Sequence, residues 1–264
     1  MQKITEQLII TKKEGVGRIA FDNQKRRNAL NYDMWCGLPI VLDNFAKDNE
    51  VRVIVLSGAG GKAFSAGADI SEFAKKRSGE DAVAIYDEAV TEATEALVLT
   101  KKPLIAQIDG FCIGGGLGVA MTCDLRIAAT DSRFAVPAAK LGLGYKIKGL
   151  KILVDQVGPA AAKEIFFTAR QFNAEEAFQM GLVNRILPAS EVAAYVDDYA
   201  NTIANNAPLT VLAAKTVVGE IIKDSVSRDL NLCQKVVDDC FASEDYQEGR
   251  QAFMEKRKPN FKGC

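Results

Sequence analysis

Two glycine-rich segments, Gly58 to Gly67 and Gly114-Gly115-Gly116, carry the strongest chemical signal in this sequence. Each comes after an apolar, β-branched run that predicts a buried strand. Because glycine has no side chain, its backbone N–H groups stay accessible. Two such amides aimed at one point make an oxyanion hole, where removing one donor typically costs on the order of 3 kcal/mol of transition-state stabilisation. For the second segment alone, close packing of a helix is the simpler interpretation.

The absence of histidine narrows the remaining chemistry. The chain has no His among its 264 residues, which excludes Ser-His-Asp and Cys-His catalysis, imidazole acid–base chemistry and His-ligated metals. The six cysteines form no CxxC pair, so we expect neither a disulfide scaffold nor a metal site. Cys112 and Cys123 flank the second glycine segment and are expected to be core residues. Any reaction must use carboxylates, Tyr, Lys, Cys or the backbone.

Three other motifs overlap the first glycine segment, and each is disfavoured. Gly58 to Ala63 matches GxGxxA, but the loop does not pass straight into a helix, as a dinucleotide-binding loop does. A P-loop requires Ser or Thr after Lys62, where this chain has Ala63. Phe64 to Gly67 is similar to a nucleophile elbow, yet Ser65 has no histidine base. We expect Ser65 to bond to the backbone instead.

The hydrophobic pattern predicts the elements that position these loops. Residues 8–21 form a hairpin, and Asn31 caps a helix that ends near Asp48. Strands are predicted at 51–58, 103–110, 125–129, 133–136 and 181–186, with an acidic helix at 79–99. From Leu150 onward the chain is mostly helical, with breaks at Gly158-Pro159, Asn173, Leu187-Pro188 and Ala207-Pro208. Two strand, glycine-loop, helix units indicate a repeated β/α architecture.

Composition and charge exclude several partners. Lys and Arg number 33 and Asp and Glu number 34, so no net field attracts nucleic acid or an anionic membrane. The apolar runs are too short to span a bilayer, and the N-terminus lacks a secretory segment. We therefore expect a cytoplasmic protein of one large domain, or of one domain with a smaller appendage.

A family resemblance rests on several motifs spread over nearly the whole chain. Lys62 to Ile70 and Asp109 to Gly116 together are similar to the paired signature of the crotonase (enoyl-CoA hydratase/isomerase) superfamily. Residues 28–31, 123–128 and 248–259 also match that family's pattern.

The resemblance implies an α/β fold, a crotonase spiral of ββα units with a C-terminal helical region used in trimerisation. We expect the core at residues 1–200 and the helical region at 201–264. The implied assembly is a homotrimer or a hexamer built as a dimer of trimers. The substrate is an acyl-CoA, so coenzyme A arrives as part of the substrate and no cofactor is bound permanently.

The resemblance also assigns roles to individual positions. Ala68 and Gly115 match the two oxyanion donors to a thioester carbonyl. The positions that match coenzyme A contacts are Ala66, Asp69 and Ile70 near the adenine, Lys25 and Arg26 near the phosphates, and Phe253 and Lys256 completing the pocket, commonly across a subunit interface.

The sequence departs from the family where a hydratase carries its two glutamates. Those positions are Gly118 and Ala138 here. Because positioned acid–base groups typically contribute 10² to 10⁴-fold, ordinary hydration and isomerisation are expected to be impaired. Substitute carboxylates occur in the acidic helix at Asp87, Glu88, Glu92 and Glu95. Their helical spacing is more typical of a solvated stripe.

A decarboxylation needs no base, because loss of CO₂ from a β-carboxyacyl thioester generates the enolate directly. Tyr145 is similar in position to the tyrosine of the family's methylmalonyl-CoA decarboxylases, although packing explains it equally well. Nearby cations that could hold a carboxylate are Lys140, Lys146, Lys148 and Lys151, which are more simply solvent-facing. Hydration, decarboxylation and non-catalytic binding of a CoA thioester stay open.

Overall fold

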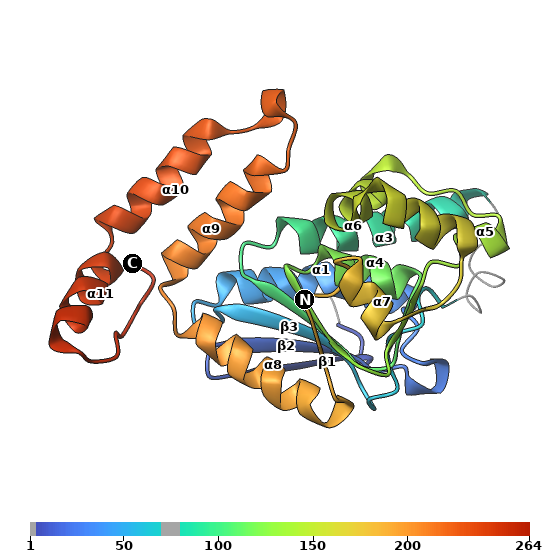
Figure 1. The fold of residues 1–264 in the computed structure, drawn as a ribbon, viewed down its shortest axis with the longest axis horizontal. Coiled ribbons are helices and arrows are strands. Elements are labelled where there is room, and N and C mark those ends of the chain that lie inside the picture. Colours follow the sequence, from blue (N-terminus) through green and yellow to red (C-terminus); the bar gives the residue numbers. More distant parts are fainter. Residues whose placement is uncertain (1–3, 70–79) are drawn as a thin grey trace.

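A computed structural model describes residues 4–69 and 80–264 as two sheets and surrounding helices (Figure 1). The larger sheet has the order β1-β2-β3-β5-β7-β10 and the smaller one β4-β6-β8-β9. The strands of the larger sheet are β1 (Leu8–Lys13), β2 (Val16–Phe21), β3 (Val53–Gly58), β5 (Leu104–Ile108), β7 (Leu125–Ala129) and β10 (Arg185–Leu187). Those of the smaller sheet are β4 (Ala63–Ser65), β6 (Phe111–Ile113), β8 (Arg133–Ala135) and β9 (Phe172–Asn173).

The described helices follow the alternating chain order that the sequence predicts. They are α1 (Tyr32–Lys47), α3 (Glu80–Leu99), α4 (Gly115–Thr122), α5 (Ala138–Leu141), α6 (Ile147–Thr168), α7 (Ala174–Gln179), α8 (Ala189–Ala204), α9 (Pro208–Ile221), α10 (Leu230–Ala242) and α11 (Glu244–Glu255). Short 3-10 turns lie at Gln24–Arg26 and Ser225–Ser227. The mixed α/β fold and the repeated β/α units are confirmed.

The larger sheet separates two apolar layers. On one face, Val192 and Val196 of α8 pack with Val53 and Val55 of β3 and with Ile105 of β5. The main core on the other face joins strand residues with α1, α3 and α4. Strands β3 and β5 are buried on both faces, which explains their near-continuous apolar sequences. Buried parallel strands fix the ends from which the site loops depart.

Several predicted boundaries are confirmed by their local chemistry. The Asn31 side chain accepts a hydrogen bond from Met34 N at 2.9 Å and caps α1, and Asn173 caps α7 in a capping box. Gly158, at φ 75°, breaks α6 as expected. The strand predicted at 181–186 is wrong in its bounds and lies at Arg185–Leu187. Gly181 (φ 78°) turns the chain there, and the following N–H group of Leu182 bonds back to Ala177 O at 2.8 Å.

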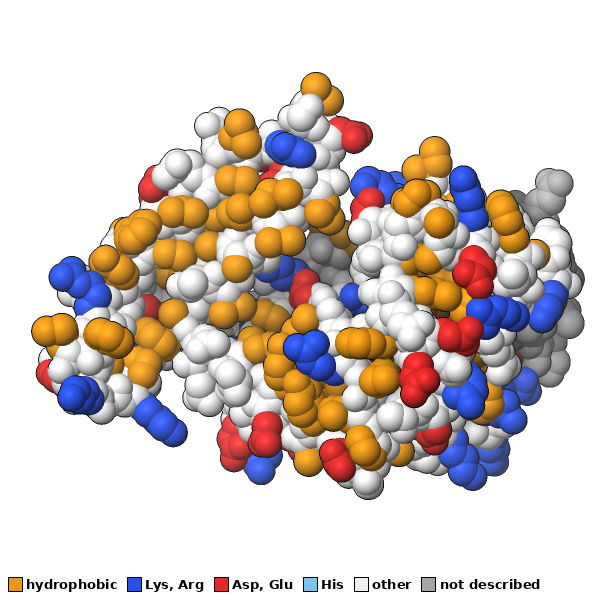
Figure 2. Space-filling view, in the orientation of Figure 1, with side chains coloured by type: hydrophobic (Ala, Val, Ile, Leu, Met, Phe, Trp, Pro, Cys, Tyr) orange, Lys and Arg blue, Asp and Glu red, His pale blue; other side chains and the backbone are white. Residues whose placement is uncertain are grey.

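Helices α9, α10 and α11 form an arm that projects from the body of the molecule (Figure 1). Arg52 connects the end of α8 to the segment that follows α11 by donating to Ala204 O at 3.0 Å and to Phe261 O at 2.6 Å. Lys215 of α9 also pairs with Asp124 at 2.8 Å. Hydrophobic side chains crowd the visible face of the arm (Figure 2). The division of the chain at residue 200 stays a prediction.

No helix in the described part of the chain is long and apolar enough to cross a membrane.

Candidate active site

The two glycine-rich segments meet beside the smaller sheet. Strands β4 and β6 pair in parallel, so the loops that leave their carboxyl ends lie next to each other. A Cβ placed on Gly67 would lie 3.2 Å from Gly115 N and 2.9 Å from Ile113 O, and one on Gly115 would lie 3.4 Å from Ala68 N. Gly67 also has φ +99°, a conformation that favours glycine. The close approach brings the amides of Ala68 and Gly115 together.

Both of these amides are available as donors. Leu30 N donates to Gly67 O at 2.7 Å and Asp69 N donates to Leu30 O at 2.9 Å, so the backbone bonds of this bridge bypass the Ala68 N–H. Gly115 is the first residue of α4, where N–H groups have no intrahelical acceptor. Across residues 4–69 and 80–264, neither N–H has an acceptor within the protein. The positive end of the α4 dipole also favours an anionic oxygen here.

The third glycine of the triplet has a packing role. A Cβ on Gly116 would lie 2.6 Å from both Cβ and O of Ser65, so no side chain fits between α4 and β4. Gly114, at φ 54° and ψ −118°, lets the chain turn into α4. This segment therefore combines both features, since Gly116 permits close helix packing and Gly115 supplies the free amide.

Buried polar groups hold the first loop. Ser65 is fully buried, and its Oγ accepts from Gly67 N at 3.1 Å, which confirms the expected backbone-bonding role. Asn28 is also buried and donates to Ala59 O at 2.9 Å and Ala63 O at 2.7 Å. The sequence alone does not reveal this role of Asn28, although residues 28–31 match the family pattern.

Four of the expected coenzyme A contacts lie on two neighbouring segments. Arg26 Nη1 pairs with Asp69 Oδ1 at 3.1 Å, and the Asp69 side chain is buried. Ala66 N donates to Arg27 O at 2.9 Å, which joins the two segments a second time. Lys25 is exposed in the 3-10 turn beside Arg26. The predicted contact Ile70 lies outside the described residues.

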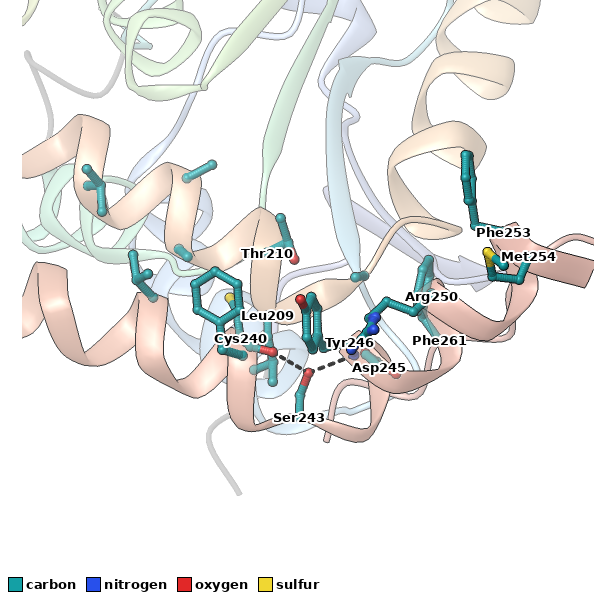
Figure 3. Close-up of a pocket in the computed structure, with 17 residues that line it drawn as sticks. Leu209, Thr210, Cys240, Ser243, Asp245, Tyr246, Arg250, Phe253, Met254 and Phe261 are labelled. Carbon is teal, nitrogen blue, oxygen red and sulfur yellow. Dashed lines mark hydrogen bonds between the residues drawn. The ribbon is translucent and has the colours of Figure 1, made fainter.

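The other two expected contacts, Phe253 and Lys256, lie at the end of α11 in the arm. Helix α11 lies at the outer end of the arm, away from the two sheets, whereas Arg26 belongs to the turn that follows β2 (Figure 1). Phe253 is 83% exposed, and with Met254 and Phe261 it lines an apolar groove of about 930 Å³ (Figure 3). The geometry is thus open to a contribution from another copy of the chain.

No carboxylate occupies the two positions where hydratases of the family carry glutamate. Gly118 lies on an exposed part of α4, and no heavy atom of residues 4–69 or 80–264 is within 4 Å of the place where its Cβ would be. Ala138, the first residue of α5, is 3% exposed. The site therefore has free volume at residue 118 and an apolar methyl group at residue 138.

Three of the four substitute carboxylates are solvated, as their spacing predicts, and the fourth, Asp87, is half-buried. Glu88, Glu92 and Glu95 are exposed on α3. Glu95 pairs with Lys148 across to α6 at 2.8 Å. The candidate carboxylate-binding lysines are also exposed, namely Lys140, Lys146, Lys148 and Lys151. These charges form a surface layer, and the expectation that they face solvent is confirmed.

Tyr145 precedes α6 and packs its ring edge-on against Phe166, with centroids 4.8 Å apart and an angle of 79°. The ring is 42% exposed, and burial of the phenol raises the pKa of Tyr145 above its ordinary value. The phenol therefore stays protonated near neutral pH and can donate a hydrogen bond. This packing accords with the structural role that the sequence left open.

The cysteines next to the second glycine segment belong to the core, as expected. Burial raises the pKa of the Cys112 thiol well above its usual range and that of Cys123 to about 12. Both side chains are buried in the main apolar cluster. A thiol with a raised pKa is a poor nucleophile, so neither is suited to covalent catalysis.

Known proteins resemble this chain along nearly its whole length. Residues 11–264 match the family described as Enoyl-CoA hydratase/isomerase. The chain is 36% identical over 251 residues to the short-chain-enoyl-CoA hydratase of Clostridium acetobutylicum, with 95% of each chain covered. It is 34% identical over 258 residues to the crotonyl-CoA hydratase of Syntrophomonas wolfei, covering 97% of this chain and 98% of that one. The crystal structure of an enoyl-CoA hydratase from Bacillus anthracis matches with a TM-score of 0.92 at 30% identity, covering 98% and 100% of the two chains.

Proposed function

This chain belongs to the enoyl-CoA hydratase/isomerase family of the crotonase superfamily, and we propose that it stabilises the enolate of an acyl-CoA thioester with the N–H groups of Ala68 and Gly115. The observation that carries the proposal is the pair of adjacent amides without an acceptor, one of them at the start of α4. Fixed donors need no reorganisation when charge develops on the thioester oxygen, so they lower the barrier to enolate formation.

The coenzyme A moiety binds along the two loops that the ion pair between Arg26 and Asp69 connects. Lys25 and Arg26 supply positive charge for the phosphates, while Ala66 and Asp69 lie along the adenine. The ion pair between Arg26 and Asp69 supports this placement, because it fixes the guanidinium at the edge of the loop that carries Ala68. Phe253 and Lys256 complete the pocket from a neighbouring copy in a trimer or hexamer.

The residues at positions 118 and 138 favour a reaction that needs no carboxylate base. In a β-carboxyacyl thioester, the bond between the α-carbon and the carboxylate breaks and CO₂ departs. The electron pair of that bond forms the thioester enolate, whose oxygen accepts from the two amides, and the α-carbon then takes a proton from water. The open space beside Gly118 and the buried methyl group of Ala138 leave room for the carboxylate, with no acidic side chain at either position to repel it.

Tyr145 is the phenol proposed to serve this reaction. The raised pKa of Tyr145 keeps its O–H available as a donor. Tyr145 lies in the segment between α5 and α6, and its partial exposure leaves the side chain accessible to a ligand. There it can orient the departing carboxylate by a hydrogen bond.

Hydration of an enoyl-CoA is the second candidate, supported by the names of relatives at 36% and 34% identity. It requires an acid and a base to deliver water, and Gly118 and Ala138 supply neither. A hydratase of this sequence must therefore draw its acid–base group from another position.

Mass spectrometry of the purified protein with two substrate pools separates these reactions. Crotonyl-CoA gains the mass of one water if the chain is a hydratase. Methylmalonyl-CoA loses the mass of CO₂ if the chain is a decarboxylase, which is the expected result. Hydration without decarboxylation would contradict our interpretation of residues 118 and 138. Tight binding of both thioesters without turnover would favour a CoA-thioester binding protein.

A further inference from the structure

Leu30 controls the direction of the Ala68 amide. The acceptor of the Leu30 N–H is Gly67 O, which belongs to the same peptide unit as the Ala68 N–H. In a trans peptide the C=O and N–H groups point in opposite directions, so the 2.7 Å bond at Gly67 O directs the Ala68 N–H away from Leu30. The bond from Asp69 N to Leu30 O fixes the next peptide unit in the same way.

Two aromatic side chains hold Leu30 from behind. The Tyr86 hydroxyl donates to Leu30 O at 3.4 Å, and Trp35 Nε1 donates to the Tyr86 hydroxyl oxygen at 3.1 Å. Leu30, Trp35 and Tyr86 are each at most 2% exposed. Because water does not reach these groups, an unmade bond among them is costly, and the chain of bonds favours one geometry.

The same tryptophan also contacts the other amide donor. A Cβ on Gly115 would lie 3.5 Å from Trp35 Cζ2, so the edge of the indole packs against the first residue of α4. Asn31, the cap of α1, sets the position of Trp35 by accepting its backbone N–H at 3.1 Å. The indole ring of Trp35 therefore contacts Gly115 directly and is connected to the Ala68 peptide through Tyr86 and Leu30.

We propose that Trp35 and Tyr86 are positioning residues that hold the Ala68 and Gly115 N–H groups at the separation a single oxygen requires. This inference rests on the proposed function. Both aromatic side chains are buried, so we expect them to act on the substrate only through the backbone at Leu30 and Gly115. Small displacements matter here, because hydrogen-bond energy falls steeply with angle and distance.

The test uses the absorption spectrum of bound cinnamoyl-CoA. Hydrogen bonds to its carbonyl polarise the conjugated thioester and move its absorption maximum to longer wavelength, and the readout needs binding but no turnover. Tyr86→Phe removes the hydroxyl and keeps the ring. We expect this variant to lose at least half of the red shift, while the Kd for cinnamoyl-CoA changes by less than about threefold. Tyr195→Phe, on the far face of the larger sheet, removes a phenol outside this network and should keep the full shift.

The outcomes distinguish failure of the positioning role from failure of the amide pair itself. A full red shift in Tyr86→Phe would overturn the positioning role and leave the amide pair intact. Absence of any red shift in the unaltered protein with bound ligand would contradict the amide pair itself. Thermal unfolding of both variants establishes that they are folded. Trp35→Phe removes the indole N–H that donates to the Tyr86 hydroxyl, and this second variant is also expected to lose the red shift.

Discussion

At the residue scale, three glycines of α4 contribute different properties to the proposed site. Gly115 offers an N–H, Gly116 offers the absence of a side chain, and Gly118 offers open space. The family resemblance named Ala68 and Gly115 from the sequence, but it could not show that the structure leaves both amides without acceptors. The buried role of Asn28 was also not predictable, because it depends on carbonyls at residues 59 and 63, distant in sequence.

Gly115→Pro should strongly reduce turnover while the protein still folds. Proline lacks the N–H, and the first position of a helix tolerates it well. We expect a loss of about 10² to 10³-fold in kcat on whichever thioester proves to be the substrate. Ala189→Pro, at the first residue of α8, is the matched control and should keep full activity. An active Gly115→Pro enzyme would remove the Gly115 N–H from the mechanism.

Gly118→Glu tests whether the missing carboxylate limits hydration. Its side chain enters open space, so we expect normal folding and a rise of about 10-fold or more in crotonyl-CoA hydration, measured by loss of enoyl absorbance. Gly118→Gln has the same shape without the charge and should show no rise. Equal rates in both variants would mean that residue 118 does not govern this chemistry.

At the element scale, strong local signals were predictable and long-range pairings were not. The Asn31 cap fixed the start of α1 from sequence, and the helix continues through Pro39 to Lys47. Strand β9 was not predicted, because it has two residues and exists only through its antiparallel pairing with β8. The contact of α4 with β4 also joins segments about 50 residues apart, so its tightness is visible only in the fold.

Gly116→Ala should weaken this contact. Its Cβ would lie 2.6 Å from the backbone O of Ser65, and a backbone atom cannot move aside as the end of a flexible side chain can. We expect a loss of about 1 to 3 kcal/mol in the free energy of unfolding, measured by urea denaturation. Gly118→Ala, on the same helix with open space around it, should instead gain about 0.5 to 1 kcal/mol. Equal effects of the two variants would argue against the close packing of α4.

At the scale of the whole molecule, the exposed arm is the feature that the chain alone leaves unexplained. Helices α9 to α11 present an apolar groove in which Val237, Phe241 and Phe253 are exposed. The sequence indicated a helical C-terminal region, but helical periodicity cannot distinguish a face that packs on its own core from one that packs on another chain. The expected contacts Phe253 and Lys256 depend on that second case.

Phe241→Asp should disrupt the proposed assembly. A buried charge in an apolar interface is costly, so the variant should dissociate. Light scattering should give about 86 kDa for a trimer, three times the 28.6 kDa chain, or twice that for a hexamer, and the monomer mass for the variant. Phe178→Asp, an exposed phenylalanine of α7 outside the groove, should leave the mass unchanged. A monomeric unaltered protein would contradict the assembly.

A crystal structure with bound acetyl-CoA would show directly whether the Ala68 and Gly115 amides bind the thioester oxygen. The account predicts that the thioester oxygen lies about 2.7 to 3.1 Å from both Ala68 N and Gly115 N. It also predicts that the coenzyme A moiety runs past Arg26 and Asp69. A thioester oxygen beyond hydrogen-bond reach of either amide would contradict the proposed enolate stabilisation.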